Sequence, residues 1–221
     1  MPWYVFALVD AVPDGPRGKG LGGNLGVRKV PGGLAIVERR ADVPPMEFGT
    51  LRKHQAVVAR LSERVPAILP VRFGTLLEGE EIDEVLRDRD EELVEAFDLV
   101  RRRVQFSWRL GKGTKETKGT KETNDPRGEA ATGTEYLIRA VRAANPDPPA
   151  AFRALRAKVA PLISAERYQP ASAQLPASLY HLVDRSAIER YHVIAQAIGH
   201  TNPGLTMSGP FPPFAFAPEI L

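Results

Sequence analysis

The sequence predicts an α+β protein of two domains, of which the second is ferredoxin-like (βαββαβ) and the first is a modified α+β sandwich. The chain has 221 residues, enough for two domains of about a hundred residues each. Its second half has the order strand, helix, strand, strand, helix, strand, which is the ferredoxin-like order. We expect an N-terminal α+β domain over 1–100, a ferredoxin-like domain over 101–208 with a mobile low-complexity loop at 111–129, and an extended Pro/Phe tail over 209–221.

Short apolar runs predict the strands of the first half. Residues 3–9 are aromatic and β-branched, which favours a strand buried on both faces. The runs at 27–30 and 34–38 are separated by Pro-Gly-Gly and predict a hairpin. The run at 67–73 predicts another strand, in which Pro70 indicates a sheet edge or a bulge.

Two amphipathic helices are predicted in the first half. Apolar positions recur at steps of three and four over 48–65, and that face consists of Leu51, His54, Val58, Leu61 and Val65. We expect a second, continuous helix over 80–100, in which Asp83 pairs with Arg87 four residues on. The acidic cluster at 78–84 would suit acid–base chemistry. Negative charge also stabilises the start of a helix, and we prefer this structural interpretation.

The second half supplies the ferredoxin-like elements. A tandem hexapeptide repeat at 113–124 has no apolar residue to bury, so we expect a mobile surface loop there. The expected elements are a half-buried strand at 101–110, a helix around 136–141 that resumes at 152–162, strands at 167–169 and 178–183, a helix at 186–199 and a strand at 205–208.

Composition excludes several classes of protein. There is no cysteine, which excludes disulfides and thiol chemistry and fits a reducing cytoplasm. The net charge is +3, a smaller excess than nucleic-acid binders usually show. No apolar run approaches a membrane span, and the N-terminus has no signal peptide pattern. We therefore expect a soluble intracellular protein that binds neither nucleic acid nor membrane.

The motifs of cofactor and metal sites lack their required context. Gly18, Gly20 and Gly23 satisfy G-x-G-x-x-G, but no helix follows them to receive a phosphate, so we interpret the segment as a flexible loop. The four histidines lack metal-binding spacing, and we expect His54 to be a hydrogen-bonded core or interface residue. No segment assembles a nucleophile, a base and an orienting group. We expect no catalytic residue, no cofactor and no metal.

Candidate partner-binding residues come from side chains that the fold leaves unexplained. Arg72 lies within an apolar run, where it is either a structural ion pair or a partner-facing anchor. The tail interleaves Phe211, Phe214 and Phe216 with prolines, and it either packs on its own chain, which we favour, or docks on a partner. The candidates are Arg72, Phe211, Phe214 and, on the first helix, Leu51, His54 and Leu61.

Three segments together resemble a known family. They are the opening Trp-Tyr-Val-Phe-Ala-Leu-Val at 3–9, Leu-Pro-Val-Arg-Phe-Gly-Thr at 69–75, and the segment 205–216 that ends Gly-Pro-Phe-Pro-Pro-Phe-Ala-Phe. The chain resembles the gas vesicle proteins of the GvpF/GvpL family over nearly its whole length. The matches at 33–37, at His54 and at 133–137 support this, whereas two tail phenylalanines stand where tryptophan and tyrosine are usual.

This resemblance implies a non-enzymatic role in building gas vesicles, with two α+β domains of which the second is ferredoxin-like. It implies binding to the small hydrophobic shell protein and to other accessory proteins during gas vesicle assembly. The alternative within the family is a minor structural component at the gas-facing side of the wall. Rivals from other classes are a small ferredoxin-like enzyme and an RNA-binding module, although residues 101–110 lack the aromatic stacking motif of an RNA-recognition sheet.

Overall fold

The computed structural model describes residues 1–111 and 147–219. The expected helix at 136–141 lies outside them, as does the predicted loop beyond its first residue. None of the described helices is long and apolar enough to cross a membrane. The chain forms two compact units: Met1–Phe106 with Leu182–Ile188 and Gly209–Leu221, and Ser107–His181 with Glu189–Ser208.

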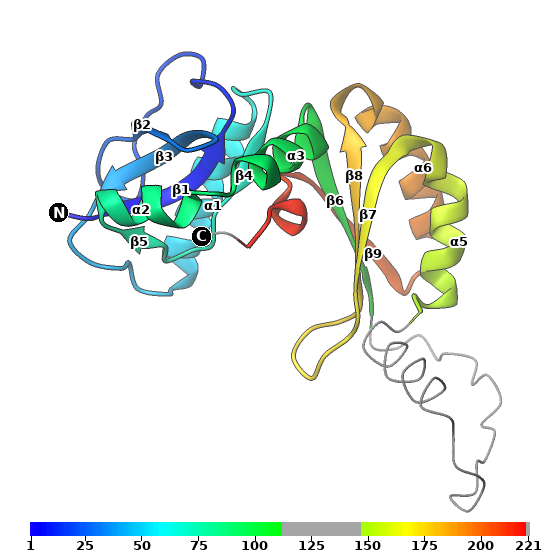
Figure 1. Ribbon diagram of the computed structural model, residues 1–221. Coiled ribbons are helices and arrows are strands. Elements are labelled where there is room, and N and C mark those ends of the chain that lie inside the picture. The colour runs from blue at the N-terminus through cyan, green and yellow to red at the C-terminus, as the bar shows by residue number, and fades with distance from the viewer. Residues whose placement is uncertain (112–146, 220–221) are drawn as a thin grey trace, which may run out of the picture. The chain divides into compact units, whose positions relative to one another are not determined.

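The first unit is built on a five-stranded sheet (Figure 1). Its strands are β1 (Trp3–Val9), β2 (Gly26–Val30), β3 (Gly33–Arg39), β4 (Ile68–Pro70) and β5 (Leu76–Leu77). The order is β2-β3-β1-β4, and β5 also pairs with β1. β2 and β3 form the predicted hairpin, and every residue of β1 after Trp3 is buried, which confirms a strand covered on both faces.

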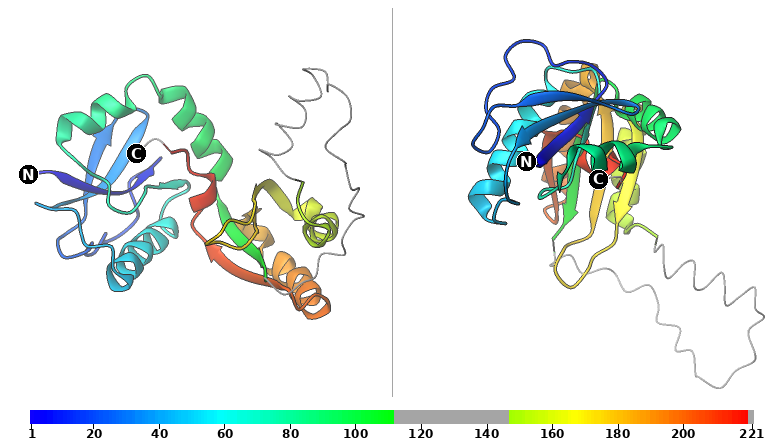
Figure 2. Two further views of the ribbon diagram at one scale, coloured as in Figure 1. Left: turned by 90° about the horizontal axis from the view of Figure 1, so that it is seen from below. Right: turned by 60° about the vertical axis from the view of Figure 1, so that its left-hand side comes forward.

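Helices cover both faces of this sheet. Figure 2 shows α1 (Phe48–Ser62) on one side and α2 (Gly79–Leu86) with α3 (Asp90–Val100) on the other. The prediction of one continuous helix over 80–100 is wrong. The chain turns between α2 and α3, where Asp88 has a φ of 66°, because the four charged residues at 87–90 have no apolar side chain to hold a continuous helix against the sheet.

The acidic start of α2 is structural. Glu78 and Glu81 form a capping box, in which the Glu81 carboxylate accepts a hydrogen bond from the Glu78 backbone at 2.6 Å. Asp83 does not pair with Arg87 as predicted. Its carboxylate accepts a hydrogen bond from the Arg28 guanidinium of β2 at 2.5 Å, because α2 packs against that strand.

The second sheet has the order β7-β8-β6-β9. Its elements are β6 (Arg103–Leu110), α5 (Ala150–Val159), β7 (Ile163–Gln169), β8 (Ser178–Asp184), α6 (Ile188–Thr201) and β9 (Leu205–Phe211). Each β-α-β crossover has another strand of the sheet between its two strands, and α5 and α6 lie on one face (Figure 1). This is the split βαβ arrangement, so the predicted α+β fold with a ferredoxin-like second part is confirmed.

Three details differ from the sequence-based expectation. β6 is not half-buried, because Gln105 and Ser107 are buried as well as the aromatic residues on the other side of the strand. Helix α6 continues past Gly199 to Thr201. The start of the tail belongs to β9, which runs to Phe211. The tail is not extended throughout, because a 3-10 turn lies at Phe214–Phe216. Two further 3-10 turns lie at Ala160–Leu162 and Arg185–Ala187.

Candidate functional site

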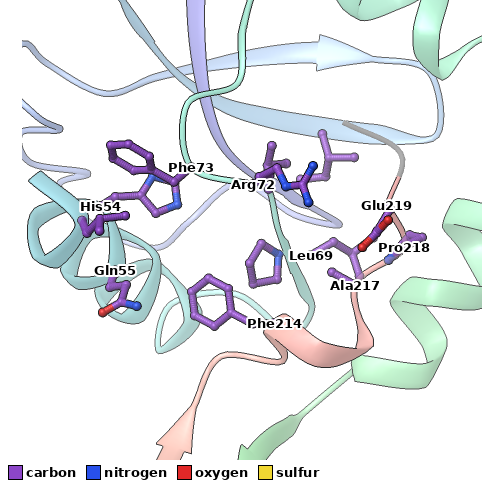
Figure 3. Close-up of a pocket in the computed structure, with 13 residues that line it drawn as sticks. His54, Gln55, Leu69, Arg72, Phe73, Phe214, Ala217, Pro218 and Glu219 are labelled. Atoms are coloured by element: carbon purple, nitrogen blue, oxygen red, sulfur yellow. The ribbon is translucent and has the colours of Figure 1, made fainter. Parts of the chain in front are cut away.

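The first unit contains a pocket of about 500 Å³. Its walls come from helix α1, from β4 with the turn that follows it, and from the C-terminal segment (Figure 3). Four of the six candidate residues line it: Leu51, His54, Arg72 and Phe214. Of the other two, Leu61 is fully buried in the core and Phe211 is exposed on β9, outside the pocket lining.

The turn after β4 shapes one wall of the pocket. The backbone N–H of Thr75 donates to the Arg72 carbonyl at 3.3 Å, and the Thr75 hydroxyl donates to the same oxygen at 2.9 Å. Gly74 occupies the third position with a φ of 94°, as type II turns require, and this conformation favours glycine. The turn therefore fixes where Arg72 and Phe73 enter the pocket wall.

An aromatic cluster lies beneath the pocket. His54 stacks on Phe6 with ring centroids 5.4 Å apart and meets Phe73 edge-on at 5.6 Å. Tyr4 lies edge-on to Phe6 at 4.9 Å. Packing of this kind holds aromatic side chains in single orientations, so the pocket has a rigid floor.

His54 is held by a hydrogen bond to Tyr4, and its burial determines its protonation state. The Tyr4 hydroxyl accepts from the Gly74 backbone N–H at 3.2 Å and lies 2.9 Å from His54 Nδ1. The Tyr4 hydroxyl therefore bridges the turn and the imidazole, with one proton and a second lone pair available for the contact with Nδ1. Burial lowers the pKa of His54 from 6.5 to about 4, and the Val71 backbone offsets only part of that shift.

His54 Nε2 is buried, and the Val71 backbone is its only neighbour with an effect on the pKa among the described residues, through a contact outside the geometry of a regular hydrogen bond. The imidazole is therefore a neutral structural group at neutral pH. This agrees with the expectation of a core histidine, and nothing here provides the base of a catalytic pair.

Arg72 is exposed and lies beyond the end of β4, not within a buried strand. Its guanidinium has no ion-pair or hydrogen-bond partner in the described part of the chain. Figure 3 shows Arg72 on the wall opposite α1, with Glu219 of the C-terminal segment on the same side of the pocket. The pocket thus combines apolar walls with one cation and one anion at its rim.

The C-terminal segment packs on the first unit, as we favoured for the tail. Phe216 is 7% exposed, and the Ala215 backbone N–H donates to the Gln105 side-chain oxygen at 2.7 Å. Phe214 is 38% exposed, and it lines the pocket together with Ala217. The segment is therefore anchored at Phe216 while it presents Phe214 as a pocket wall.

Pro70 closes the sheet edge beside the pocket to strand addition. The Val71 N–H donates to the Phe6 carbonyl at 3.0 Å, so these residues form a hydrogen-bonded antiparallel pair. The next pair, Pro70 with Ala7, then directs its backbone groups away from each other. The nitrogen of Pro70 faces the free edge and carries no proton, which confirms the edge-strand interpretation.

The expectation of a flexible glycine-rich loop is wrong, because hydrogen bonds from other segments hold it in place. The buried carboxylate of Glu38 accepts hydrogen bonds from the backbone N–H groups of Leu21, Gly22 and Gly23 at 2.6, 3.1 and 2.7 Å. Arg60 of α1 donates to two carbonyls of the same loop. An internal carboxylate therefore occupies the place where a nucleotide-binding loop would hold phosphate. The signal for it in the sequence is a carboxylate at the end of an apolar strand.

The second unit has a buried polar network. The Trp108 indole N–H donates to the Tyr191 hydroxyl at 2.7 Å, and that hydroxyl lies 2.6 Å from His181 Nδ1. His181 Nε2 lies 3.2 Å from Glu166, and this hydrogen bond lowers the pKa of the Glu166 carboxyl. The first three side chains are fully buried, so the network joins strands and helix without offering a substrate access. No three His, Asp or Glu residues in 1–111 and 147–219 lie close enough to hold a metal ion.

Exposed apolar side chains lie at the start of α1, just before that helix and beside the turn after β4. Phe48 is 76% exposed and Met46 is 79% exposed. Phe48 lies one helical turn before Leu51, on the same face of α1. Val43, 55% exposed, lies beside Gly74. We name Val43, Met46 and Phe48 the apolar rim.

The fold is a two-part α+β architecture whose first unit contains a pocket, and the described residues bring together no catalytic constellation. The family model for the gas vesicle synthesis protein GvpL/GvpF matches residues 2–218, and the chain belongs to that family. The fold is similar to crystal structures of gas vesicle protein GvpF from Anabaena (TM-score 0.69, 15% identity, 98% of this chain and 96% of that one) and Microcystis aeruginosa (TM-score 0.72, 15% identity, 98% and 99%). Comparison with curated proteins gives no match.

Proposed function

We propose that this chain is a non-enzymatic gas vesicle assembly protein. It binds the small hydrophobic shell protein and other accessory proteins while gas vesicles form, and it works at the gas vesicle in the cytoplasm. Family membership supports the setting. The observation that carries the binding role is the pocket of the first unit with its apolar rim.

The physical reason lies in the partner. An amphipathic shell subunit exposes apolar surface before it is incorporated, and such surface drives uncontrolled association. A rigid apolar pocket with exposed phenylalanine and methionine side chains beside it suits temporary cover of that surface. The titratable clusters of the described residues are buried or structurally paired, which supports a role without catalysis.

Co-expression with the shell protein of the same operon, followed by affinity capture of this chain, tests the proposal. Wild type should recover the shell protein, and the double variant Met46→Ser/Phe48→Ser should recover several-fold less. Val193→Ser is the matched control, because Val193 is 69% exposed on α6, in the other unit. Thermal unfolding should show that all variants remain folded, since exposed positions change stability little.

Failure of folded wild type to recover any shell protein would refute the proposed binding. The alternative role, a retained component of the vesicle wall, predicts a different result. In that case, purified gas vesicles would contain this chain in a constant ratio to the shell protein after washing.

A further inference from the structure

We propose that the pocket binds a protein segment carrying a large apolar side chain beside a carboxylate. In this arrangement, Arg72 pairs with the partner's carboxylate, and the nearby Glu219 carboxylate weakens that pairing by repulsion. The inference deepens the proposed function and rests on it in one respect, namely that the occupant is a protein.

The apolar requirement follows from the lining. Leu51, Leu69, Phe73 and Phe214 are among the lining residues, over the rigid aromatic floor. A volume of about 500 Å³ lies within the range of pockets that bind small ligands, and it has room for a large side chain with part of its backbone. Because the floor is rigid, little ordering cost accompanies binding.

The carboxylate requirement follows from charge. Arg72 provides a planar fork of donors that matches a carboxylate, and no described residue occupies it. It is the one cationic side chain among the pocket's lining residues, and Glu219 lies on the same rim. A phosphate dianion would be repelled by that carboxylate about twice as strongly as a single carboxylate, so the lining favours the smaller negative charge.

The way in which the partner enters follows from the sheet edge. Strand addition along β4 requires outward N–H groups at alternate residues, and Pro70 at the end of the strand has none to give. The C-terminal segment also packs against β4. The partner must therefore insert a side chain into the pocket and cannot extend the sheet.

Binding of a small probe tests the pocket apart from the vesicle partner. The probe is N-acetyl-phenylalanyl-glutamate amide, and its control is the glutamine analogue, which has the same shape without the charge. In the ¹⁵N spectrum, the acidic probe should shift the Arg72 Nε–H and the Gly74 amide. The glutamine analogue should bind about threefold to tenfold more weakly, the range expected for one ion pair on a partly apolar surface.

Two variants of the charged lining residues should change binding of the acidic probe in opposite directions. Arg72→Gln should remove the preference for the acidic probe, whereas Glu219→Gln should strengthen its binding because a repelling carboxylate is lost. Arg87→Gln makes the same change of charge at an exposed residue outside the pocket lining and should change nothing. Equal binding of both probes to wild type, or an unchanged preference in Arg72→Gln, would overturn the inference.

The same variants in the shell-protein capture separate this inference from the proposed function. Recovery that falls with Arg72→Gln and rises with Glu219→Gln supports the pocket as the site of contact. Recovery by wild type that neither variant changes overturns the pocket as that site and leaves the assembly role standing. Absence of recovery by wild type, with the probe preference intact, refutes the shell partner and retains the pocket's specificity.

Discussion

Acid should destabilise this protein through His54, and the structure sets the size of the effect. Burial lowers the pKa of the imidazole from 6.5 to about 4. Between these values the unfolded chain binds a proton that the folded chain excludes, so the free energy of unfolding falls as the pH falls. Because one pKa unit corresponds to about 1.4 kcal/mol, His54 should account for a loss of about 3 kcal/mol between pH 7 and pH 4.

Urea unfolding at a series of pH values between 4.5 and 7.5 measures this contribution. The comparison variant is His54→Asn, whose side-chain oxygen can accept the Tyr4 hydroxyl hydrogen bond but does not titrate. The variant should be less stable than wild type at pH 7.5 because it leaves a cavity. The difference between the two proteins should shrink by about 2 kcal/mol or more towards pH 4.5.

All other titrating groups are common to both proteins, so their effects cancel in this difference. A difference in stability that stays constant across the pH series would refute the reasoning. So would an NMR titration in which the His54 ring takes up its proton near pH 6.5.

Three further stability predictions follow from single contacts, each measured by urea unfolding. Glu38→Ala should cost about 2–5 kcal/mol and speed amide exchange in the glycine-rich loop, because three N–H groups lose a charged acceptor; unchanged exchange would contradict this. Gly74→Ala should cost about 1–3 kcal/mol because its φ is positive, whereas Gly49→Ala, which meets open space within α1, should stabilise by up to about 1 kcal/mol. Tyr191→Phe should cost about 2–4 kcal/mol because it leaves a buried indole and imidazole without their shared hydroxyl; a smaller loss than that of Tyr180→Phe, a half-buried hydroxyl, would count against it.

Much of the fold was predictable because its signals are local. The strand at 3–9, the hairpin with its Pro-Gly-Gly turn and the edge position of Pro70 each depend on a few adjacent residues. The order of elements in the second half also sufficed for the ferredoxin-like arrangement. The break between α2 and α3 was missed, because helical periodicity continues on both sides of four charged residues and does not reveal which of them adopts a positive φ.

The candidate site was predictable only in part. Leu51, His54, Arg72 and Phe214 were chosen as unexplained residues, and the pocket brings them together. Glu219 was not selected, because an exposed carboxylate near a chain end has no pattern of its own.

The conformation of the glycine-rich loop was also not predictable from the sequence. Its sequence predicted a flexible loop, whereas Glu38, more than ten residues further on, holds three of its backbone N–H groups. No pattern of sequence spacing predicts which carboxylate will accept hydrogen bonds from the N–H groups of a given loop.

By itself, the sequence determined the α+β class, the order of the elements and the resemblance to the GvpF/GvpL family, because periodicity, turn residues and motifs are properties of neighbouring positions. Only the tertiary structure decided that Arg72 is exposed, that Leu61 is buried in the core and that Phe214 closes a pocket with helix α1. The physical reason is that burial, charge pairing and the direction of a side chain depend on contacts between segments that are distant in the chain. Those contacts exist only once the sheet has placed its strands side by side.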